Sequence, residues 1–205
     1  MRLVLVGSLG VLALGSLALA QTPAPSQPAT DAPVVERPFA EGGRVHLQLA
    51  SGDYVVRAGA SDRIVVRWEA GDDSRVSDVK ELLVDVRVTG STAVVVTEGQ
   101  TRDMDFVIEL PARSDVSLRI RAGDIRLEGI EGHKDVRMTA GDLKIGVRRE
   151  SLASAHASVT FGDLDARALG VSKSGVKRSL DWIGGGRYEL DARLGAGDLT
   201  VVETR

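Results

Sequence analysis

The chain contains no cysteine and no asparagine, and only 3% of its residues are aromatic. Without cysteine it has no disulfide, thiolate zinc site, iron–sulfur cluster, cysteine nucleophile or lipid-modified cysteine anchor. An excess of positive charge is also missing, because the formal net charge is −3, and this argues against general binding to nucleic acid. What is present is a globular composition, with 43% hydrophobic and 27% charged residues among 205, which predicts a folded domain.

The N-terminus has the pattern of a secretory signal peptide. Arg2 precedes an uncharged apolar stretch over residues 3–20, and Ala18-Leu19-Ala20 at its end is a small-residue cleavage pattern. An uncleaved membrane anchor is the alternative, because 18 apolar residues are just long enough to span a bilayer. We expect residues 1–20 to be removed and the mature protein to be exported, to the periplasm or the cell surface, with no integral membrane domain left.

A proline-rich spacer is expected over residues 21–38, which hold five of the six prolines. Such a segment is extended and has no core of its own. It either holds the domain away from a surface or is a plain terminal extension. Residues 39–205 are predicted to form a single domain.

Within that domain, apolar residues recur with a period of two. The alternation is clear over residues 46–49, 83–89, 105–110 and 115–121, and it buries one face of a β-strand while solvating the other. A short helical turn is expected only at residues 74–82. Residues 171–187, which include three consecutive glycines, predict a long loop in which Trp182 and Ile183 cover the end of the fold or contact a partner. The predicted fold class is all-β.

A short motif repeats along the domain: a small residue or Phe, then Gly-Asp, then an apolar residue. Its five copies contain Gly52 and Asp53, Gly123 and Asp124, Gly141 and Asp142, Gly162 and Asp163, and Gly197 and Asp198, with Ala70-Gly71-Asp72 as a degenerate sixth. Successive glycines from Gly123 onward are separated by 18, 21 and 35 residues, the last being close to two coils. This period predicts a β-solenoid, a single-stranded β-helix-like stack of short strands with Gly-Asp corners.

The chemistry of the motif suits a corner between two strands. Glycine adopts positive φ angles that other residues resist, and aspartate hydrogen-bonds a nearby backbone N–H. The parity of the apolar residues also shifts there, since Ile120 belongs to one set and Ile125 to the other. A bend lets both sets face one core, and stacked coils would then place Ile125 beside Leu143, and Leu127 beside Ile145.

These features resemble the bacterial putative-adhesin domain of unknown function. The resemblance covers residues 36–203 and rests on Ser51-Gly52-Asp53, on Leu110-Pro111 before Val116, and on Gly195-Ala196-Gly197-Asp198. It implies a β-helix-like envelope domain. It brings no catalytic residues that could be carried over to this chain.

Other chemistry is weakly supported by the sequence. Stacked aspartates supply the oxygen ligands that calcium prefers, but the nine-residue glycine-rich repeat of calcium-binding solenoids is missing, so the Gly-Asp pairs are interpreted as structural corners. His46, His133 and His156 lie in no metal-binding spacing. We therefore predict no catalytic residue, no metal and no cofactor. A polysaccharide-cleaving enzyme is the enzymatic alternative, by analogy of fold alone.

One set of outward positions suggests a contact surface. On consecutive predicted strands these are the basic residues Arg119, Arg121, Arg126, Arg137 and Lys144. Stacked, they would form a basic stripe facing anionic envelope glycans or lipid headgroups, since arginine binds carboxylate and phosphate in a bidentate manner. The alternative is an ordinary solvated face balanced by nearby acidic residues.

The sequence thus favours a non-catalytic, exported envelope or surface protein, an adhesin-like binding module of unknown ligand. The alternative is a structural scaffold that pairs with another envelope protein through an exposed end near Trp182. The polysaccharide-acting enzyme ranks third.

Overall fold

The computed structural model describes residues 33–70, 82–99 and 104–204. These residues form thirteen β-strands and two 3-10 turns, Arg149–Ser151 and Arg167–Leu169, and no α-helix, so the all-β prediction is confirmed. None of the described segments is a helix long and apolar enough to cross a membrane. The predicted signal peptide, residues 21–32 of the spacer, and residues 71–81, with the degenerate motif and most of the expected helical turn, lie outside the described residues.

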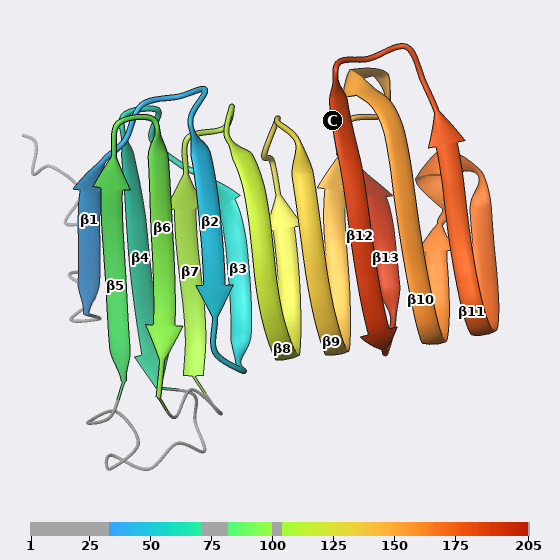
Figure 1. The fold of residues 1–205 in the computed structure, drawn as a ribbon, viewed down its shortest axis with the longest axis horizontal. Helices are drawn as coiled ribbons and strands as arrows, with labels where there is room; N and C mark the ends of the chain where they lie inside the picture. Colours follow the sequence, from blue (N-terminus) through green and yellow to red (C-terminus); the bar gives the residue numbers. More distant parts are fainter. Residues whose placement is uncertain (1–32, 71–81, 100–103, 205) are drawn as a thin grey trace, which may run out of the picture. The chain divides into compact units, whose positions relative to one another are not determined.

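The strands of the domain lie in two layers (Figure 1). The first layer contains β5 (Leu83–Thr89), β6 (Thr92–Glu98), β2 (Arg44–Leu49) and β12 (Tyr188–Ala196). The second contains β1 (Val34–Pro38), β4 (Arg63–Ala70), β7 (Met104–Leu110), β3 (Asp53–Ala58) and β13 (Leu199–Glu203). Four long strands bend at one edge and contribute an arm to each layer: β8 (Asp115–Glu128), β9 (Lys134–Val147), β10 (Leu152–Ala166) and β11 (Val171–Ile183).

The centre of the fold is a parallel stack. In the first layer β6, β2, β8, β9, β12 and β10 pair in parallel in that order. Ile125 pairs with Leu143 and Leu127 with Ile145, as the spacing of the motif predicts, and all four side chains are buried. Because β9 and β10 each pair with β12 through one arm and with β13 through the other, these four strands form a closed ring of parallel ladders.

The structure departs from a regular solenoid in two respects. Antiparallel pairs flank the parallel stack, with β5 on β6 and β1 on β4 on β7 at one end and β11 on β10 at the other. The coils also do not stack in chain order, because β12 and β13 lie between β9 and β10. The chain turns back as β11 before it enters β12, and this explains the long spacing between Gly162 and Gly197.

Two segments that the sequence assigned to irregular structure are strands. Residues 34–38, taken as the end of the spacer, form β1 on the edge of the second layer, where Pro38 leaves no ladder hydrogen bond unmade. Most of the predicted loop 171–187 is β11, which pairs along its length with β10. Its pattern gave no strand signal because β11 is an outermost strand, and most of its side chains are exposed.

The core fills the space between the two layers. The Tyr54 and Phe106 rings of the second layer stack with centroids 4.5 Å apart. The Tyr54 hydroxyl reaches the first layer, where it lies 2.8 Å from Thr97 Oγ1, and the same oxygen accepts the Ala50 N–H at 2.9 Å. Thr97 is 3% exposed, so these polar contacts fix the distance between the layers at this point.

Candidate functional site

The Gly-Asp pairs lie where the chain passes from one layer into the other. Those of Gly123, Gly141 and Gly162 lie within β8, β9 and β10, and those of Gly52 and Gly197 lie where β2 is followed by β3 and β12 by β13. Gly123, Gly141, Gly162 and Gly197 have φ angles between +115° and +133°. A Cβ on Gly141 would lie 2.0 Å from the Gly123 carbonyl oxygen, and a Cβ on Gly197 would lie 2.0 Å from that of Gly141. These positions therefore require glycine for both backbone conformation and close stacking.

The aspartates of the corners form a hydrogen-bonded ladder in the spatial order Asp53, Asp124, Asp142, Asp198, Asp163. The Oδ1 of each accepts the backbone N–H of the next, over 3.1 to 3.3 Å. Each carboxylate thus caps the neighbouring coil. Within the described residues, no group of three or more His, Asp or Glu side chains is arranged to hold a metal ion.

The bend divides the predicted basic stripe between the two layers. Arg119, Arg121 and Arg137 lie before the corners, on the first layer, whereas Arg126 and Lys144 lie beyond the corners, on the second, where they pair with each other. The expectation of one continuous stripe is therefore wrong. The stripe is divided because the parity of inward and outward residues changes at Gly-Asp. The inward side chains on both sides of the bend face one core, whereas the outward side chains lie on different layers.

Sequence reasoning missed one member of the row on the first layer. Arg119 pairs with Arg137, and Arg137 pairs with Arg193 on β12, so three arginines stand in register on adjacent strands. Each stands four residues before a corner glycine, and that shared offset was the signal that would have identified Arg193. Gln48 and Ser158 occupy the same position on the strands at either end. We call Arg119, Arg137 and Arg193 the arginine row.

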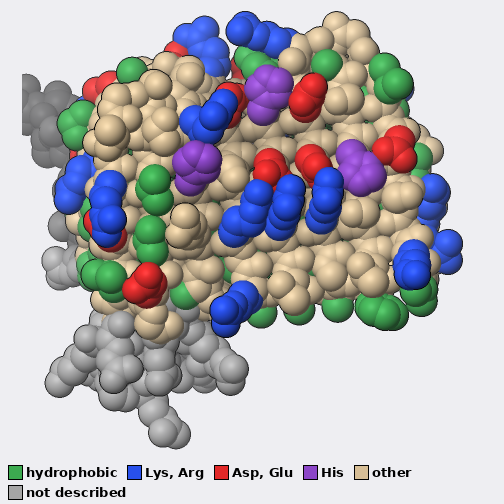
Figure 2. Space-filling view, viewed as in Figure 1, with side chains coloured by type: hydrophobic (Ala, Val, Ile, Leu, Met, Phe, Trp, Pro, Cys, Tyr) green, Lys and Arg blue, Asp and Glu red, His purple; other side chains and the backbone are tan. Residues whose placement is uncertain are grey.

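Two carboxylates lie beside the arginine row (Figure 2). Asp135 Oδ2 lies 2.6 Å from Arg119 and its Oδ1 lies 3.4 Å from Arg137, while Asp191 pairs with Arg193 at 2.9 Å. Partial burial raises the pKa of Asp135, but the two arginines outweigh it and the pKa falls below its ordinary value. A carboxylate held ionised in this way is a poor general acid.

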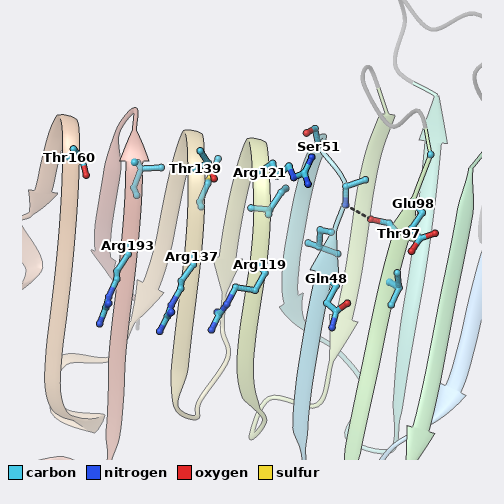
Figure 3. Close-up of a pocket in the computed structure, with 18 of the residues that line it drawn as sticks. Gln48, Ser51, Thr97, Glu98, Arg119, Arg121, Arg137, Thr139, Thr160 and Arg193 are labelled. Carbon is cyan, nitrogen blue, oxygen red and sulfur yellow. Dashed lines mark hydrogen bonds between the residues drawn. The ribbon is translucent and has the colours of Figure 1, made fainter.

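The arginine row borders a groove of about 1450 Å³ that crosses the first layer. The groove extends from Glu98 on β6 to Thr160 on β10. Arg121 and Thr139 line its other side with Thr160, and the labelled side chains form two rows across the strands (Figure 3). Four arginines and one glutamate are its charged lining residues among those described. This surface is therefore locally positive on a chain whose net charge is −3.

The arginine row is partly anchored and partly available. Arg119 donates through Nη1 to the carbonyls of Leu118 and Asp135 and through Nη2 to the Asp135 carboxylate, and this fixes its guanidinium. Arg137, in the middle, contacts only Asp135 through Nε, and its terminal nitrogens have no partner among the described residues. Arg193 uses Nε and Nη2 on Asp191, which leaves Nη1. The free donors can bind a carboxylate or a phosphate.

No histidine among the described residues lines this groove, although His156 pairs with Asp191, one of the two carboxylates beside the arginine row. His156 Nδ1 lies 2.7 Å from Asp181 on β11. His133 Nδ1 accepts the Glu189 N–H at 3.2 Å, and its ring meets the Tyr188 ring edge-on. His46 lies on β2. The arrangement of these side chains is explained by local hydrogen bonds and packing.

Comparison with known proteins gives a likeness of fold. No protein-family model and no curated protein matches the chain. A putative cell adhesion protein from Clostridium sporogenes superposes with a TM-score of 0.54 at 9% identity, over 84% of this chain and 100% of that one. Putative adhesins from Parabacteroides merdae and Bacteroides fragilis match at 11% and 12% identity with TM-scores of 0.27, over 83% and 86% of this chain and 80% and 99% of theirs. The first match shows that a bacterial protein of that description shares the fold.

Proposed function

We propose that this protein is a non-catalytic, exported surface-binding module whose β-solenoid-like stack presents the groove and arginine row to an anionic component of the cell envelope. The observation that carries the proposal is the register of Arg119, Arg137 and Arg193 on three adjacent parallel strands. The fold that the chain shares with a putative cell adhesion protein is consistent with this role, as is the signal-peptide pattern of residues 1–20.

The physical basis is preorganisation. The three arginines stand on hydrogen-bonded strands that lie about 4.8 Å apart, and their mutual repulsion is only partly offset by the two aspartates. An anion in the groove relieves that repulsion and replaces water with charge-assisted hydrogen bonds. Because the strands are already ordered, the entropy lost on binding is confined to side chains and ligand.

The test is co-sedimentation with envelope material separated into peptidoglycan, membrane lipid and polysaccharide, at low and high salt. The double variant Arg137→Gln with Arg193→Gln is expected to lose binding. The variant Arg126→Gln with Lys144→Gln is the matched control, because it removes the same charge from the other layer, and it is expected to bind like the parent. Equal losses in both variants, or binding that salt does not weaken, would contradict the proposal.

A second candidate is a scaffold that docks through the β10–β11 end. Three large apolar side chains are exposed there: Phe161 at 58%, Val176 at 55% and Ile183 at 87%. Phe161 and Val176 pair across the two strands, and β11 is an edge strand. If this end is the contact surface, replacing Phe161 and Val176 by Ser will abolish co-sedimentation with the envelope fractions. The double variant Arg137→Gln with Arg193→Gln will then still co-sediment with them.

A further inference from the structure

The arginine row has a direction and a length. It runs across the strands, perpendicular to the chain, and one cation stands on each of β8, β9 and β12. The row ends on both sides at uncharged residues, Gln48 on β2 and Ser158 on β10. The groove continues beyond Gln48 to Glu98 on β6, and at its other end it includes Ser158 and Thr160 on β10. A ligand that uses the whole groove is therefore longer than its charged segment in contact with the row.

The two sides of the groove differ in chemistry. One side is the arginine row, and Figure 3 shows Thr139 and Thr160 in the second row, on the other side, with one cation, Arg121, beside them. Both threonines are exposed, so their hydroxyls are available to donate and accept hydrogen bonds. No aromatic side chain lines the groove among the described residues. The groove thus offers charge and hydroxyl contacts, without a ring on which a flat ligand could stack.

We infer that the ligand is a linear acidic polysaccharide, bound across the strands with its successive carboxylates matched to the three arginines. The inference rests on the proposed function and specifies its ligand. A sugar chain supplies hydroxyls for the threonine side and a regularly repeated carboxylate for the arginine side. The strand spacing of about 4.8 Å sets the interval at which successive carboxylates of the ligand contact successive arginines. A single lipid headgroup would contact one arginine of the row and leave the rest of the groove empty.

The number of arginines in the row should set the length of acidic oligosaccharide that binds most tightly. Binding is expected to strengthen with each acidic sugar until all three arginines are occupied, roughly tenfold or more per contact, and to change little beyond that. Removing Arg193, at one end of the row, shortens it to two. Ser158→Arg extends the row by one strand, since Ser158 pairs with Arg193, and it is exposed enough to carry a longer side chain outward.

The experiment is calorimetric titration of the full chain with oligouronides of increasing length and, separately, with vesicles of phosphatidylglycerol. For the parent, affinity is expected to level off at three acidic sugars. Arg193→Gln should move this limit to two, and Ser158→Arg should move it to four. The gain in the last variant cannot arise from misfolding. Arg126→Gln, on the other layer, should leave the limit unchanged.

The outcomes separate the ligand from the proposed function. Affinity that is independent of oligouronide length, or a limit that none of the variants moves, overturns the inference. Binding to the vesicles that equals or exceeds binding to oligouronides overturns it in favour of lipid headgroups, and the proposed function would stand. Loss of the proposed function itself would be seen in the co-sedimentation assay, as envelope binding that does not depend on the arginine row.

Discussion

The glycine corners make a quantitative prediction about stability. Gly141→Ala places a Cβ 2.0 Å from the Gly123 carbonyl oxygen and 2.6 Å from Met138 Cε, at a φ of +115°. The backbone conformation costs about 1–3 kcal/mol for a residue with a side chain, and forcing apart stacked coils adds about 1–3 kcal/mol. The free energy of unfolding should therefore fall by about 2–6 kcal/mol, a large part of the total for a domain of this size.

Gly42→Ala is the matched control. Gly42 also has a positive φ, +80°, but nothing lies within 4 Å of its added Cβ, so only the conformational cost of about 1–2 kcal/mol applies. Both substitutions reduce the entropy of the unfolded chain equally, and this term cancels in the comparison. Urea unfolding followed by tryptophan fluorescence measures both, because Trp68 and Trp182 are half-buried at opposite ends of the stack. Equal losses at the two sites would refute the close-stacking argument.

Three further predictions follow from described contacts. Asp142→Ala removes the acceptor of the Asp198 N–H and should lower the urea midpoint, whereas Asp142→Asn keeps an oxygen there and should not; a midpoint raised by calcium would contradict this capping role. Burial lowers the pKa of Lys134 to about 8 from its ordinary value of 10.5. Between these two pH values Lys134 is protonated in the unfolded chain and neutral in the folded one, so the free energy of unfolding rises with pH. Lys134→Met should thus raise the free energy of unfolding at neutral pH by about 3 kcal/mol, and a gain that persists undiminished above pH 10.5 would exclude charge burial as its cause. Thr97→Val leaves the Ala50 N–H without its acceptor and should cost about 1–3 kcal/mol in the same assay, in contrast to an exposed substitution such as Thr139→Val.

The local pattern predicted the pairing of strands but not their order. The Gly-Asp spacing correctly placed Ile125 beside Leu143, because a parallel in-register ladder follows directly from repeated corners. The order of β12, β13 and β10 could not be read in this way. It depends on the antiparallel return of the chain through β11, and an edge strand of this kind needs no apolar face to reveal it.

The candidate site shows the same division between local and long-range information. Alternation identified Arg119 and Arg137 as outward residues, and the corner offset would have added Arg193. Arg126 and Lys144 satisfy alternation equally well, but they follow the bend, and the direction of an outward side chain after a bend depends on the turn itself. The groove depends on strands far apart in the sequence, including Glu98 on β6 and Thr160 on β10.

The in-register corners also make the fold extensible by whole units. Residues 124–141 run from one corner to the next and contain two outward arginines, Arg126 on the second layer and Arg137, which stands on the first layer at the shared offset from the corner glycine. A tandem duplication of this segment would insert one coil, one glycine contact, one aspartate cap and one arginine of the row together, without changing the register of its neighbours. If the proposed ligand binds along the arginine row, the number of repeats would set the length that is bound, and gene duplication alone would be enough to alter it.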